Sequence, residues 1–146
     1  MGSLGAAQFI SGQREIWHAT TRITSNFVTS SDVYVDVTNA TITITGLTAS
    51  KTYRVIAWYM TDVISSAATQ DAIIGIAIAG TIGGEQRISC NLSAYKCVSL
   101  VNSDSVTGVT SVICKVQVKD ASASASNLTF NDQLLKNVLF GIAIEV

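Results

Sequence analysis

The chain has 146 residues and a net charge of −1; charged residues make up 13% of it and hydrophobic residues 48%. This composition excludes a disordered chain, and the scattered lysines and arginines exclude the clustered basic face that nucleic-acid binding requires. The charged share is about half of what soluble domains usually carry, so we expect part of the surface to face another protein.

The length predicts a single domain over residues 1–146, with residues 1–13 as a candidate N-terminal arm. The longest apolar stretch, near "IIGIAIAGTIGG", is shorter than the roughly 18 residues that a membrane-spanning helix needs. The opening "MGSLGAAQFISGQRE" lacks the basic region and apolar core of a signal peptide. We therefore expect no contact with a membrane.

Alternation and many Val, Ile and Thr predict strands along the whole chain. The first runs through "REIWHATTRIT", and "NFVTSSDVYVDVTNATITITGL" is interpreted as a strand, a hairpin turn at "TNA" and a second strand. In these two strands Val33, Val35 and Val37 share one face, and Ile42 and Ile44 point inward. A long strand follows, with Tyr53, Val55, Ala57 and Tyr59 on one face.

The second half continues in the same way. "DAIIGIAIAG" is a strand closed by "GTIGG", "EQRISCNLSAYKCVSLVN" is a strand, a turn and a strand, and "VTSVICKVQVKD" alternates cleanly. "FNDQLLKNVL" could hold a single helical turn before the terminal strand "NVLFGIAIEV". We expect "ISSAATQ", "SDSVTG" and "ASASASN" to be exposed loops. The total is about eight to ten antiparallel strands, which is typical of a sandwich or barrel.

Two strands share the sequence Gly-Ile-Ala-Ile and show no polar face. We expect Ile76, Ile78, Ile142 and Ile144 to fill the core. The small residues on the opposite faces would form a flat stripe against a partner, or would lie under another part of the same chain. The candidate interface residues are therefore Gly75, Ala77, Ala79, Gly141 and Ala143.

The three cysteines form no CxxC motif. Cys90 and Cys97 are a candidate disulfide across a short loop, which would leave Cys114 as a buried thiol. The alternative is that all three are free. No metal site and no cofactor are expected, because the cysteines have no histidine nearby.

No catalytic signature is present. His18, the single histidine, lies in a strand-like segment, and the chain has no GxSxG elbow for a nucleophilic serine. We interpret His18 as a strand or interface residue, and we expect no enzymatic activity. Four aromatic residues are candidates for stacking on a sugar, with core or interface packing as the alternative for each: Trp17, Trp58, Tyr59 and Tyr95.

From about Asn26 onward the order of strands resembles that of small virion proteins. The segments that carry the resemblance are "FVTSSDVYVDVTNATITITGL", "KTYRVIAWYMTDV", "IIGIAIAGTIGGEQ" and the stretch from "VTSVICKVQVKD" to the end. Such proteins, which decorate capsids or form the heads of fibres, have the jelly-roll fold shared with tumour necrosis factor and the complement globular head. The segment "SNLTF" followed by "LLKNV" departs from the simplest pattern by an insertion.

The resemblance implies an all-β, antiparallel jelly-roll sandwich that assembles as a homotrimer, with the outer face of one sheet packed around the threefold axis. It implies a structural role on the virion surface, with other virion proteins as partners. The alternative is a secreted or fibre-borne lectin-like head that binds a host-surface glycan. Stoichiometric copies in purified particles would favour the first function, and glycan binding that is lost with one exposed aromatic residue would favour the second.

Overall fold

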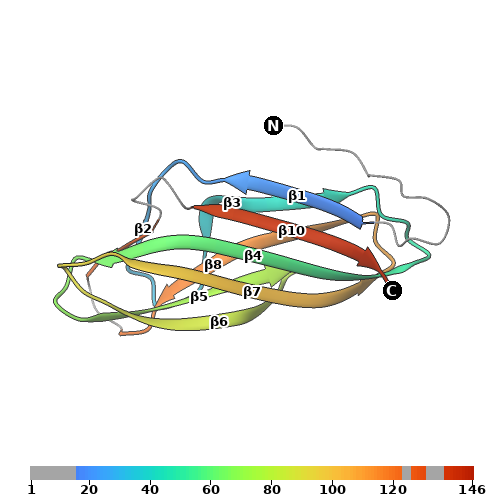
Figure 1. Ribbon diagram of the computed structural model, residues 1–146. Helices are drawn as coiled ribbons and strands as arrows, with labels where there is room; N and C mark the ends of the chain where they lie inside the picture. Colours follow the sequence, from blue (N-terminus) through green and yellow to red (C-terminus); the bar gives the residue numbers. More distant parts are fainter. Residues whose placement is uncertain (1–15, 123–125, 131–136) are drawn as a thin grey trace.

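The computed structural model describes residues 16–122, 126–130 and 137–146 (Figure 1). The ten strands among these residues are β1 (Ile16–Arg22), β2 (Phe27–Thr29), β3 (Val35–Thr45), β4 (Thr52–Ser65), β5 (Gln70–Ile78), β6 (Thr81–Cys90), β7 (Lys96–Thr107), β8 (Ser111–Asp120), β9 (Leu128–Phe130) and β10 (Val138–Glu145). The candidate N-terminal arm at 1–13 and most of the "FNDQLLKNVL" segment lie outside the described residues.

The strands form two antiparallel sheets that pack face to face (Figure 1). In sheet 1 the order is β1-β10-β4-β7, and the short strands β9 and β2 extend it beyond the end of β10. In sheet 2 the order is β3-β8-β5-β6. This interleaving of the eight longer strands between the two sheets is the jelly roll of two Greek keys. The predicted all-β, antiparallel jelly-roll sandwich is therefore confirmed.

The core lies between the sheets and is filled by the inward residues of each strand. Tyr53, Val55, Ala57 and Tyr59 on β4 are fully buried, as predicted. Trp17 packs edge-on against Tyr53, with ring centroids 5.1 Å apart. This T-shaped geometry is one that aromatic pairs prefer, so the two rings stabilise the packing of β1 and β4 in the core.

At one edge of the sandwich the two sheets come into direct contact. The side chain of Asn102 on β7 donates a hydrogen bond to the carbonyl of Ile76 on β5, at 2.8 Å. Gly84 on β6 has a positive φ of 60°, and a Cβ there would lie 2.2 Å from the carbonyl oxygen of Val101. Only glycine allows the backbone of β6 to lie this close to the backbone of β7.

The predicted turns at "TNA" and "SDSVTG" are wrong. The proposed hairpin at "TNA" lies inside β3, where Asn39 has a positive φ of 65° and the pairing with β8 shifts between Asp36 and Thr41. Both halves of β3 therefore pair with the same strand, and the irregularity is a bulge. The predicted loop "SDSVTG" is strand up to Thr107, because its serines alternate outward while Val106 points into the core.

The first Gly-Ile-Ala-Ile strand ends in a two-residue turn at Ala79 and Gly80. Both residues have positive φ values, 50° and 89°, as a tight hairpin between twisted strands requires. As a result β6 begins at Thr81, and the predicted "GTIGG" turn is mostly strand.

Candidate functional site

The outer face of sheet 1 is apolar along β10 and β4, with one further apolar residue each on β1 and β7. The pairing register places Phe140 beside Trp58, and Trp58 beside Val101, so that apolar side chains form rows across the sheet. Met60 is 42% exposed and Val101 49%. We call this surface the apolar face; its residues are Ile16, Ile56, Trp58, Met60, Val101, Val138, Phe140, Ile142 and Ile144.

An aromatic cluster lies within the apolar face. The ring centroids of Trp58 and Phe140 are 5.5 Å apart, with planes inclined by 32°. His18 on β1 lies on the other side of Phe140, at 6.5 Å and 30°. Because each ring contacts a neighbour, the cluster is held in place by contacts within the subunit.

Polar residues surround the apolar face. Arg22 pairs with Val138 at one end of β10, and Arg54 pairs with Ile144 at the other end. On β7 the outward residues nearest to Val101 in either direction are serines, namely Ser99, Ser103 and Ser105. An apolar centre rich in aromatic residues and Met, with a polar rim, is the usual anatomy of a protein–protein interface.

The outer face of sheet 2 is covered instead by polar contacts. Asp36 accepts hydrogen bonds from Lys115 at 2.9 Å and Gln117 at 2.8 Å. The hydrogen bond from Lys115, and then that from Gln117, lower the pKa of Asp36 below its usual value. Asp71 is paired with Arg87 at 2.8 Å, and its pKa is lowered chiefly by the hydrogen bond from Ser89 and then by that from Arg87.

Further aromatic and charged groups extend this network. The hydroxyl of Tyr34 donates a hydrogen bond to Glu85, and the ammonium group of Lys119 lies 4.5 Å from the centre of the Tyr34 ring. Burial, and then the hydrogen bond to Glu85, raise the pKa of Tyr34. Tyr34 and Glu85 therefore join the two edge regions of sheet 2 across its outer surface.

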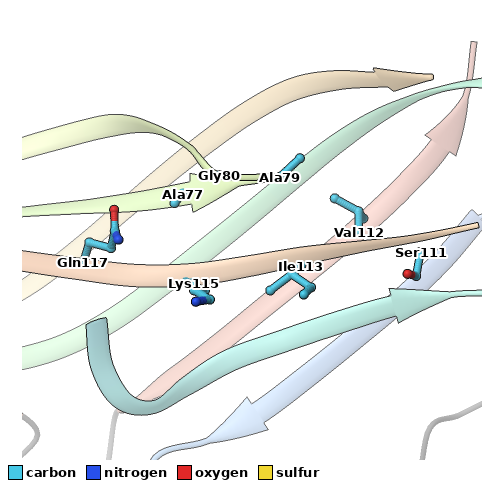
Figure 2. A pocket seen from close by; sticks show the side chains of 8 residues that line it. All are labelled: Ala77, Ala79, Gly80, Ser111, Val112, Ile113, Lys115 and Gln117. Carbon is cyan, nitrogen blue, oxygen red and sulfur yellow. The ribbon is translucent and has the colours of Figure 1, made fainter. Parts of the chain in front are cut away.

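Between β5 and β8 the same outer face is hollowed (Figure 2). The hollow has a volume of about 360 Å³, and Figure 2 shows its lining side chains on β5, on the turn that follows it and on β8. Ala77 is only 3% exposed, whereas Ile113 on β8 is 45% exposed. The polar lining residues are Ser111, Lys115 and Gln117.

The predicted orientation of the terminal Gly-Ile-Ala-Ile strand is wrong. Ala143 is fully buried in the core, and a Cβ at Gly141 would lie 2.8 Å from Cδ1 of Ile42. Ile142 and Ile144 are on the outer face. Strand β10 crosses the core where Ile42 and Ile44 fill the space, so it is the small side chains that fit inside. Gly141 and Ala143 therefore cannot contact a partner.

The first Gly-Ile-Ala-Ile strand is oriented as predicted, with Ile76 and Ile78 in the core. Its small residues are nevertheless covered within the chain: a Cβ at Gly75 would meet the side chains of Ile82 and Glu85. Ala77 lines the hollow, and Ala79 is exposed in the turn. The stripe thus lies largely under the protein's own residues, which is the alternative to a partner.

The four candidate stacking residues do not form one site. Trp17 and Tyr59 are in the core, at 6% and 0% exposure, which corrects the prediction for both. Trp58 belongs to the apolar face, and Tyr95 is exposed in the connection before β7.

All three cysteines are free in the structure, so the candidate disulfide between Cys90 and Cys97 is not formed. Cys90 ends β6 in sheet 2 and Cys97 begins β7 in sheet 1, and only Cys97 is exposed. Burial raises the pKa of Cys90 and that of Cys114, each to about 11.

The described residues contain no group of three His, Cys, Asp or Glu side chains that could hold a metal ion. In the same part of the chain, no helix is long and apolar enough to cross a membrane. His18 lies in strand β1 and its ring is 6.5 Å from that of Phe140 in the apolar face.

The apolar face is not among the sites predicted from the sequence, although the sequence of β10 carries one signal of it. In "VLFGIAIE" both alternating sets of β10 are apolar up to Glu145, and the bulkier set is Val138, Phe140, Ile142 and Ile144. Bulk alone suggests the core; only the packing of β10 over Ile42 and Ile44 shows that the smaller set points inward.

Comparison with known protein families finds no match, and comparison with curated proteins finds none either. Among solved structures, dimeric latent PorU from Porphyromonas gingivalis is similar over 97% of this chain and 14% of PorU, with 8% identity and a TM-score of 0.50. Eiger TNF from S. frugiperda matches over 90% of this chain and 91% of its own, with 11% identity and a TM-score of 0.36. The VP2 protein of infectious bursal disease virus matches over 92% and 36%, with 12% identity and a TM-score of 0.39. At these identities the likeness concerns the fold alone.

Proposed function

We propose that this protein is a non-enzymatic structural subunit of a virion, a homotrimer that decorates a capsid or forms the head of a fibre. Its mechanism is the burial of surface between subunits. The observation that carries the proposal is the apolar face of sheet 1, which has an aromatic centre and a polar rim. A soluble monomer seldom exposes a contiguous apolar surface of this kind without a partner for it.

The size of the apolar face fits an interface. Strand β10 pairs with β4 over eight residues, about 27 Å, and four strands spaced by about 4.8 Å give the outer face of sheet 1, polar rim included, a flat area of about 500 Å². A standard interface takes about 800 Å² from each partner, which is of the same order.

The charges of the face favour a copy of the same chain as the partner. Among the described residues, Arg22 and Arg54 are its exposed charged side chains and lie at opposite ends, while Asp62 is only 4% exposed. A strongly charged partner would lose hydration without gaining ion pairs at the apolar centre. In a homotrimer the apolar faces of three copies can meet around the threefold axis, while the arginines stay at the rim.

The test is the mass of the protein in solution, compared with that of Met60→Glu and Leu92→Glu. Met60 is 42% exposed in the apolar face, and Leu92 is 57% exposed in the connection between β6 and β7. We expect wild type and Leu92→Glu to be trimers by light scattering, and Met60→Glu to be a folded monomer with unchanged circular dichroism. A wild-type monomer at micromolar concentration would contradict the assembly mechanism.

The virion role needs a separate measurement. Purified particles from the source of this gene should contain the chain at a fixed, stoichiometric copy number, and Met60→Glu should be missing from them. Absence of the wild-type chain from particles would contradict the virion role even if the trimer forms.

A further inference from the structure

We propose that the hollow on the outer face of sheet 2 is a binding site for a neutral saccharide. The site is distinct from the apolar face, since the two lie on opposite outer surfaces of the sandwich. In an assembly that buries sheet 1, the hollow remains open to solvent. Its volume of about 360 Å³ lies in the range of small-molecule sites, about 300 to 1,000 Å³.

The polar groups of the hollow are arranged in advance. One carboxylate oxygen of Asp36 accepts a hydrogen bond from Nε2 of Gln117, at 2.8 Å. The other accepts a hydrogen bond from Nζ of Lys115, at 2.9 Å. This fixes both side chains at the edge of the hollow. The amide oxygen of Gln117 is left as an acceptor, and the ammonium group of Lys115 retains further donor hydrogens.

Alternating donors and acceptors suit sugar hydroxyls, each of which can donate and accept. Lys115 offers donors, Gln117 an acceptor, and Ser111 a hydroxyl at the exposed end of the hollow. The buried Ala77 and the exposed Ile113 supply an apolar surface that can contact the C–H face of a sugar ring. A polyol with one apolar face matches this combination.

The charge balance favours a neutral ligand over an anion. Lys115 is the positively charged residue that lines the hollow, and it forms an ion pair with Asp36 at 2.9 Å. The low pKa of Asp36 keeps the carboxylate ionised at neutral pH. The pair therefore presents little net charge, and a phosphate or carboxylate would have to compete with Asp36 for Lys115.

We expect weak binding at each site. Hydrogen bonds to sugar hydroxyls replace hydrogen bonds to water, so each adds little net affinity, and we expect a Kd of about 1 mM. Several copies held in one assembly would raise the overall strength of binding to a surface that carries many sugars.

The experiment is a titration of the isotope-labelled full chain with glucose, galactose and N-acetylglucosamine, followed by amide chemical shifts. At millimolar sugar we expect at least one of the three to shift the amides of Ala77, Ile113 and Lys115. Gln117→Ala should raise Kd about tenfold. Ala77→Leu, whose larger side chain fills the hollow, should abolish binding. Gln86→Ala, a matched change of an exposed glutamine outside the lining, should leave Kd unchanged.

Three outcomes would overturn the proposal: no shifts at tens of millimolar sugar, shifts centred on Trp58 or Tyr95, or stronger shifts of the same amides with inorganic phosphate. Because the readout is local, it does not depend on whether the chain is a trimer. Failure here leaves the proposed assembly standing, and a monomeric protein leaves the saccharide site standing.

Discussion

The two outer faces of the sandwich are built from strands of similar length, yet they meet their surroundings in different ways. Sheet 1 exposes Trp58, Met60 and Val101, whereas sheet 2 pairs Asp36 with Lys115 and Asp71 with Arg87. A jelly roll leaves both outer faces available, so the fold does not choose between them. The contrast shows that the sparse charge of this chain is distributed unevenly, with paired charge on one face and almost none on the other.

The largest effect should come from a pair of neighbouring substitutions on β10. Ala143→Glu places a charge in the core beside fully buried side chains, and we expect a loss of roughly 4 kcal/mol or more in the free energy of unfolding. Ile142→Glu places the same charge on the apolar face and should leave the subunit folded but monomeric. Urea denaturation and light scattering measure the two effects.

The opposite behaviour of the two variants would contradict the orientation of β10. An assembled and stable Ala143→Glu protein would mean that the small residues face outward after all.

A smaller effect concerns Cys97, the exposed thiol on the outer side of sheet 1. In the folded protein we expect one fast-reacting thiol per chain, because Cys90 and Cys114 are buried and their pKa values are raised to about 11. If the apolar face is covered by another copy, Cys97 should react more slowly in the trimer than in Met60→Glu.

Thiol labelling with Ellman's reagent measures these rates, and Cys97→Ser is the control that should remove the fast phase. Equal rates in the trimer and in the monomeric variant would show that the β7 side of the face is left uncovered.

The smallest effect is the response to acid of the paired charges on sheet 2. The pKa values of Asp36 and Asp71 are lowered in the folded state, so their contribution is present above the unfolded value, near 4, and is lost as pH falls through the folded values. Both pairs are at the surface, where each contributes at most about 1 kcal/mol.

We therefore expect a modest drop in the melting temperature between pH 5 and pH 3, which Asp36→Asn together with Asp71→Asn should reduce. Added salt should weaken the same pairs without dissociating the trimer, because the apolar face has few charges to screen. Dissociation at moderate salt, measured by sedimentation, would show that charge holds the subunits together.

Several features of this protein follow from its sequence alone. Alternation of apolar and polar residues determined the strands, and the inward set of β4, from Tyr53 to Tyr59, could be assigned because its outward neighbours include Arg54. The period of two in a strand fixes which residues share a face. The low content of charge also predicts that part of the surface faces a partner, which stays a prediction.

The tertiary structure decided what periodicity leaves open. Where both alternating sets are apolar, as in β10, the pattern names two faces but not which one is inside; the space left by Ile42 and Ile44 selects Gly141 and Ala143. The bulge at Asn39 and the hollow between β5 and β8 likewise depend on strands that are distant in the chain. A local pattern specifies faces, and only the packing of one sheet on the other assigns them to core, partner or solvent.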